Sequence, residues 1–69
     1  MTIPKNEILW VQYIASDGTV THIITSDKHR DTYKLYKIEG GDLVYTKHKA
    51  SDPRDLERWV YENVGKQAN

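Results

Sequence analysis

The sequence predicts an α+β domain in the order ββββα: a four-stranded antiparallel meander of two hairpins, with one C-terminal helix packed on one face. Two observations predict the sheet, because Asp17–Gly18 and Gly40–Gly41 each separate two runs rich in β-branched and aromatic residues. A third predicts the helix, because residues 51–65 combine capping residues at both ends with an apolar stripe. A small curled barrel capped by the same helix is the alternative architecture.

All 69 residues are expected to form a single small α+β domain. Residues 1–6 are polar and contain Pro4, so we expect a loose N-terminal lead-in there, and a loose tail at residues 66–69. A chain this short buries only about 60% of its unfolded surface. It contains no cysteine, so no disulfide can stabilise it. Good packing or oligomerisation must therefore hold the fold together.

The first hairpin is predicted to pair strands Glu7–Ala15 and Val20–Ser26 across Asp17–Gly18, two residues that tolerate positive φ. With that turn centre, three cross-strand pairs form: Ala15 with Val20, Tyr13 with His22, and Val11 with Ile24. One face, the better candidate for the core, carries Leu9, Val11, Tyr13, Ala15, Val20, His22 and Ile24. The other face is half apolar and carries Ile8, Trp10, Gln12, Ile14, Thr21, Ile23 and Thr25.

A charged connection, residues 27–31, leads to the second hairpin, whose strands Thr32–Ile38 and Leu43–Lys49 flank Gly40–Gly41. That turn centre predicts three cross-strand pairs: Ile38 with Leu43, Tyr36 with Tyr45, and Lys34 with Lys47. Both faces mix apolar and basic residues, so the sequence does not select the buried face.

The helix is predicted within residues 51–65, SDPRDLERWVYENVG. Asp52 suits the N-cap, Pro53 suits the first helical position, and Gly65 can take the left-handed conformation that ends a helix. The apolar stripe consists of Leu56, Trp59, Val60 and Val64. Because a helix of about three turns is marginal alone in water, it must pack on the sheet.

Charge and hydropathy narrow the class of protein. Ten basic and ten acidic residues give a formal net charge of zero, which argues against wholesale electrostatic binding to nucleic acid or membranes. No apolar run is long enough to span a bilayer, and Met1–Asn6 lacks the apolar core of a signal peptide. With no cysteine either, we expect a cytoplasmic protein.

The sequence also predicts that the chain is not an enzyme and holds no metal or cofactor. His22, His29 and His48 lack paired ligand spacing, and no glycine-rich phosphate loop or nucleophile in a recognisable context is present. His29 lies two residues from Asp31 and could in principle be an oriented base. So small a chain has little room for a substrate pocket, so no small-molecule substrate is expected.

The leading hypothesis is a protein–protein interaction module whose partner-binding residues are Ile8, Trp10, Ile14 and Ile23. A sheet covered by one helix has one wet face, and an exposed apolar patch on it marks a partner surface. The module would act as a homodimer or as a small regulator that docks on a larger partner. The competing interpretation is that strand curvature or the N-terminal lead-in covers these residues.

The alternative function is binding of single-stranded nucleic acid through the second hairpin. Its contacts would be Lys34, Tyr36, Tyr45 and Lys47, with phosphates on the lysines and bases on the rings. Lysine on a strand is also a common guard against edge-to-edge aggregation. An exposed edge strand could itself accept a partner strand by augmentation.

In small size, lack of a catalytic signature and strand-then-helix order, the chain is similar in general style to accessory proteins of bacteria and their phages. No motif carries this likeness, and it assigns no residue. Chromodomain-like binders also combine strands with a terminal helix, but their aromatic cage has no residue-by-residue counterpart here.

Overall fold

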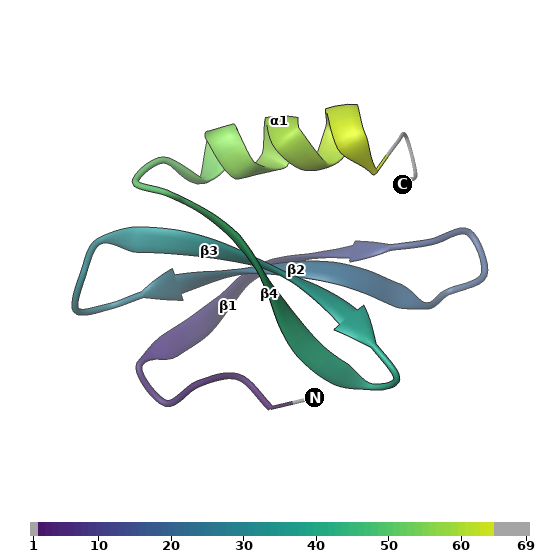
Figure 1. Cartoon of the computed structure of the whole chain (residues 1–69), viewed down its shortest axis with the longest axis horizontal. Coiled ribbons are helices and arrows are strands. Elements are labelled where there is room, and N and C mark those ends of the chain that lie inside the picture. Colours follow the sequence, from purple (N-terminus) through teal and green to yellow (C-terminus); the bar gives the residue numbers. More distant parts are fainter. Residues whose placement is uncertain (1, 65–69) are drawn as a thin grey trace.

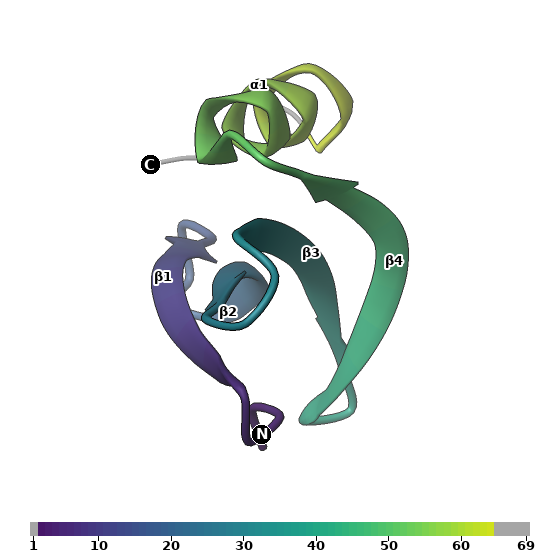
Figure 2. The ribbon, with the colours of Figure 1, turned by 90° about the vertical axis from the view of Figure 1, so that its left-hand side faces the viewer.

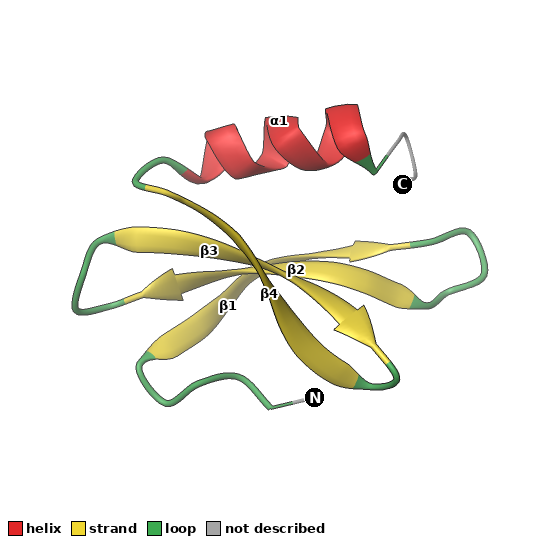
Figure 3. Cartoon of the chain, viewed as in Figure 1, coloured by secondary structure: helices red, strands yellow, loops and turns green. Residues whose placement is uncertain are grey.

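The computed structural model describes residues 2–64 and confirms the ββββα fold (Figures 1 and 3). Its elements are β1 (Glu7–Ile14), β2 (Val20–Asp27), β3 (Thr32–Glu39), β4 (Asp42–Ala50) and α1 (Pro53–Asn63). The strands form one antiparallel sheet in the order β1-β2-β3-β4, so the sheet is an open meander with β1 and β4 at its edges.

The two hairpin turns lie where the glycine signals predict them. Gly40 and Gly41 both have positive φ, 59° and 85°, and close a two-residue turn that leaves Ile38 opposite Leu43 and Tyr36 opposite Tyr45 as predicted. At the first turn Gly18 has φ 90°, and the Asp17 carboxylate accepts a hydrogen bond from the Thr19 amide at 2.9 Å.

The first connection is longer than predicted. It spans residues 15–19, and Val20 pairs with Ile14, so the predicted pairing of Val20 with Ala15 is wrong. The pairing register shifts between Tyr13 and Ile14, which moves the partner of Val20 by one residue. Beyond this irregularity, Tyr13 with His22 and Val11 with Ile24 are confirmed.

The main core lies between the sheet and α1, which packs against β3 and β4. Its buried centre consists of Ile24, Leu35, Leu56 and Val60, with Trp59 and Val64 partly buried around it. The predicted helix stripe therefore faces the sheet. Asp52 caps the helix by accepting a hydrogen bond from the Arg54 amide at 2.9 Å. The predicted helix end at Gly65 and the tail at 66–69 lie outside the described residues.

A β-bulge at Trp10 changes which residues of β1 share a face. Leu9 pairs with Thr25 and Val11 with Ile24, so Trp10 is the extra residue. Val11 packs on the helix side, as predicted. Leu9, however, moves to the face away from α1, because it lies opposite Thr25, which alternates with the core residue Ile24. The simple alternation predicted for this strand is therefore wrong on the N-terminal side of the bulge.

β4 carries its own irregularity, at Lys47. Lys34 pairs with Lys49, so the predicted pairing of Lys34 with Lys47 is wrong. Lys47 has φ 71°, in the left-handed region, and the register shifts between the Lys34 and Tyr36 pairs. The Thr46 hydroxyl lies inside this irregular stretch and donates a hydrogen bond to the Leu35 carbonyl at 2.8 Å.

The face away from α1 is curled and carries a second small core. Figure 2 shows β1 and the first half of β4 extending away from the helix, while the N-terminal lead-in lies near the β3–β4 turn. Ile23 is fully buried and Tyr36, its cross-strand partner, is nearly so. No helix within residues 2–64 is long and apolar enough to cross a membrane.

Candidate functional site

The β1 edge is the most apolar exposed part of the described chain. We define it as Ile8, Leu9 and Trp10, three consecutive large apolar residues that are 45%, 43% and 49% exposed. Soluble proteins blunt such edges with charge or cover, because their unpaired N–H and C=O groups can bind another strand. Here the apolar residues remain at the surface of an edge strand.

The exposed residues of the β1 edge lie on both faces of the sheet. Ile8 is opposite Ser26, which shares the helix-side face with Ile24. The Trp10 ring makes an edge-on contact with Tyr33, with ring centroids 5.2 Å apart, and Tyr33 packs against the helix-side core. Leu9 lies on the opposite face. What unites the three residues is the edge itself rather than one face.

Ile14 and Ile23, the other two predicted partner-binding residues, differ in their exposure to solvent. Ile14 is 44% exposed at the far end of β1 and can extend the β1 edge. Ile23 is 0% exposed, because it lies on central strand β2 beneath the curled face. Its predicted place in an exposed patch is therefore wrong.

Leu9 is the edge residue that sequence reasoning missed, because strict alternation assigned it to the core face. The run Ile8-Leu9-Trp10 contains three consecutive apolar residues in a strand expected to have one wet face. Such a run breaks the period of two, and this break was the available signal of a bulge.

Glu7, the first residue of β1, is charged, and its carboxylate is paired inside the protein. Glu7 is nearly buried, and its Oε1 accepts hydrogen bonds from the Thr25 and Tyr36 hydroxyls, both at 2.8 Å. Its Oε2 pairs with Lys34 Nζ at 3.0 Å, and Lys34 Nζ also lies 3.6 Å from Asp27 Oδ2. We call these five residues the Glu7 cluster. It leaves the outer side of β1 without an exposed charge from Glu7 to Ile14.

The Glu7 cluster holds its acids ionised. Burial raises the pKa of Glu7, but hydrogen bonds from Thr25, Tyr36 and Lys34 outweigh it, so the pKa lies below its ordinary value. The hydrogen bond to Glu7 raises the pKa of Lys34. Burial, then the neighbouring Glu7, raises the pKa of Tyr36. The cluster is thus a satisfied internal ion pair that ties β1 to β2 and β3.

The same contacts occupy two of the residues that were predicted to bind nucleic acid. Lys34 is engaged by Glu7 and Asp27, and Tyr36 is buried with its hydroxyl on Glu7. Tyr45 and Lys47 are exposed on β4, and the Tyr45 ring lies 5.5 Å from that of Tyr36. The structure therefore does not bring the four residues together as one accessible surface.

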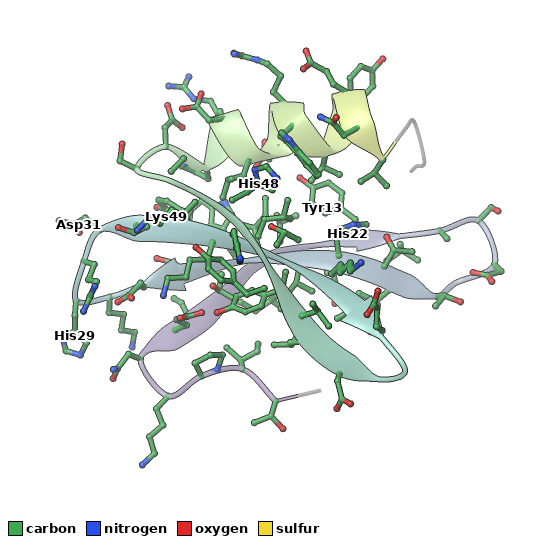
Figure 4. All side chains as sticks on the ribbon, in the orientation of Figure 1. Tyr13, His22, His29, Asp31, His48 and Lys49 are labelled. Atoms are coloured by element: carbon green, nitrogen blue, oxygen red, sulfur yellow. The ribbon has the colours of Figure 1, made fainter. Side chains whose placement is uncertain are left out.

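The three histidines lie in separate parts of the fold (Figure 4). His22 lies on the sheet near Tyr13, and its Nδ1 is 3.0 Å from the Thr21 hydroxyl. Burial, then the charge of Lys37, lowers its pKa. His48 stacks against Trp59 beneath α1, with ring centroids 4.2 Å apart. His29 and Asp31 lie in the exposed β2–β3 turn, away from both.

No group of three or more metal-binding side chains occurs among residues 2–64. Burial, then the charge of Glu57, raises the pKa of Tyr13 to about 12.

Comparison of the chain with known proteins finds no matching family model, no matching curated protein and no matching solved structure.

Proposed function

We propose that this chain is a non-enzymatic protein-binding module that docks its partner along the β1 edge. The observation that carries the proposal is the exposure of Ile8, Leu9 and Trp10 on both faces of one edge strand. A partner seated on one face of the sheet would cover only some of them. A partner strand added beside β1 would hydrogen-bond to the free edge and bring apolar side chains over both faces.

The internal neutralisation of Glu7 supports this mode of docking. A carboxylate pointing outward at the start of β1 would oppose an approaching apolar strand through its desolvation. In this chain Lys34, Thr25 and Tyr36 hold it inward. Side chains that face a docking strand along β1 are therefore uncharged.

Single-stranded nucleic acid remains the second candidate and has less support. Of its four predicted contacts, Lys34 already neutralises acids of its own chain and Tyr36 is buried. Binding through Tyr45 and Lys47 alone would give at most a weak, salt-sensitive affinity.

Site-specific photo-crosslinking tests the proposal. A photoreactive benzoylphenylalanine at Leu9 should form adducts with protein in a cell extract, whereas the same group at the exposed Lys49 of β4 should form few. The two positions are matched, because both are exposed and both lie on an edge strand. Equal adduct yields at both positions, or none at position 9, would contradict the proposal.

A further inference from the structure

Two residues of opposite charge lie at the two ends of β1 and bear on which partner its edge can bind. Lys5 precedes β1 and Asp17 follows it, and both are exposed. Neither belongs to an ion pair within residues 2–64. The strand between them exposes apolar and uncharged side chains. The edge thus has a positive end, an apolar centre and a negative end.

This order of charges is self-complementary in one orientation. When two copies of β1 run antiparallel, the positive end of each meets the negative end of the other. When they run parallel, lysine meets lysine and aspartate meets aspartate, which is unfavourable. An antiparallel pair of identical strands also has a two-fold axis and forms a closed dimer.

We propose that the partner at the β1 edge is a second copy of this chain, paired antiparallel through β1 so that the Lys5 end of each strand lies beside the Asp17 end of the other. This pairing places the two-fold axis near the middle of β1 and joins the two sheets into one continuous sheet. Ile8, Leu9 and Trp10 of each copy then lie beside the C-terminal half of β1 of the other, which includes the exposed Ile14. The inference rests on the proposed docking function and names its partner.

The small size of the described fold agrees with self-association. A domain of this size without disulfides buries a smaller fraction of its unfolded surface than a larger domain does, and pairing through β1 would bury its most apolar exposed strand. The opposite edge does not offer the same surface, because β4 exposes Lys47 and Lys49.

The first test is the solution mass of the full chain over a concentration series, by sedimentation or by light scattering. Wild type should be a dimer that dissociates on dilution. Leu9→Lys should be monomeric, because it places a charge in the centre of the paired edge. Tyr61→Lys, which changes an exposed aromatic residue on α1, should dimerise like wild type. A wild type that is monomeric at every concentration, or a Leu9→Lys variant that dimerises normally, would overturn the inference.

The second test does not depend on the folding of Leu9→Lys. Lys5→Glu should weaken the dimer about tenfold, because it turns two attractions into two repulsions. Adding Asp17→Lys to Lys5→Glu should restore the affinity, because the exchanged charges again match. A thermal melt of each variant checks that the fold is retained. Failure of a folded double variant to recover would contradict the antiparallel orientation.

The crosslinking experiment separates this inference from the proposed function. Adducts at position 9 with other proteins, from a chain that is monomeric when pure, would overturn the second copy as partner and leave protein docking intact. Adducts between two copies would support both. A monomer without adducts would overturn both.

Discussion

β1 and β4 both border the sheet, yet their outward surfaces differ in chemistry. β1 exposes Ile8, Leu9 and Trp10, and its acid at position 7 is turned inward. β4 exposes Lys47 and Lys49, and its register is broken where Lys47 takes a left-handed conformation. Both edge strands are irregular, since β1 has its bulge at Trp10, so the difference lies in the side chains. Exposed lysines protect an edge from pairing, and β1 has none.

The two edges also differ in how they are fastened to the rest of the protein. β1 is tied at its N-terminal end by the Glu7 cluster, an ionic and hydrogen-bonded contact. β4 is fastened at its C-terminal end by packing, since Ala50 lies against the main core and His48 stacks on Trp59. An edge strand can therefore be firmly held on its inner side and still be open on its outer side.

The largest expected effect on stability comes from disrupting the Glu7 cluster. Glu7→Ala should lower the free energy of unfolding by about 3 kcal/mol, because Lys34 loses its buried partner and two hydroxyls lose an acceptor. Urea denaturation measures the change. Glu39→Ala, which breaks the exposed Lys37–Glu39 pair, is the control and should cost about 0.5 kcal/mol or less. Equal losses in the two variants would show that the Glu7 cluster does not fasten β1.

Low pH should selectively weaken the Glu7 cluster, which holds β1 against β2 and β3. The pKa of Glu7 in the folded protein lies below its ordinary value of 4.5, so its contribution is complete above pH 4.5 and is lost as the pH falls through the lowered value. Glu7→Gln, which cannot ionise, should be less stable than wild type by about 2 kcal/mol at neutral pH. The gap should close in strong acid. Urea denaturation across the acidic range measures it, and a gap independent of pH would contradict the ionic account.

The smallest expected effect concerns the broken register of β4. Lys47→Gly should raise the free energy of unfolding by about 0.5 kcal/mol, because glycine takes φ 71° without the cost that other residues bear. Lys49→Gly removes the same charge from the same strand and should lower stability by about 0.5 to 1 kcal/mol. Thermal or urea melts of the two variants compare them directly. If both variants respond alike, backbone strain at Lys47 does not contribute.

Much of the fold could be predicted because its signals are local. Turn glycines, β-branched runs and a helix cap each occupy a few neighbouring residues, and all four strands and the helix form where these signals lie. The pairing Tyr36–Tyr45 followed directly from a two-residue turn. Near such a turn, local geometry leaves little freedom in the register.

What escaped prediction depends on distant parts of the chain. The three hydrogen bonds of Glu7 join residues 18 to 29 positions apart, so no local pattern marks Glu7 as buried. The bulge at Trp10 shifted half of β1 to the other face, and Ile23 is buried on the central strand β2. As a result, the predicted exposure was right for Ile8, Trp10 and Ile14, whereas Leu9 was missed and the buried Ile23 was wrongly included.

The two tryptophans of the chain occupy opposite situations. Trp10 is half exposed on the β1 edge, whereas Trp59 packs beneath α1 against the ring of His48. The fluorescence of the two tryptophans therefore reports two different events. Emission from Trp10 responds to the removal of water from the β1 edge, and emission from Trp59 responds to unpacking of the helix. Replacing Trp59 with phenylalanine would leave Trp10 on the β1 edge as the only tryptophan. A partner that covered this edge would then shift the emission wavelength of the protein without any attached label.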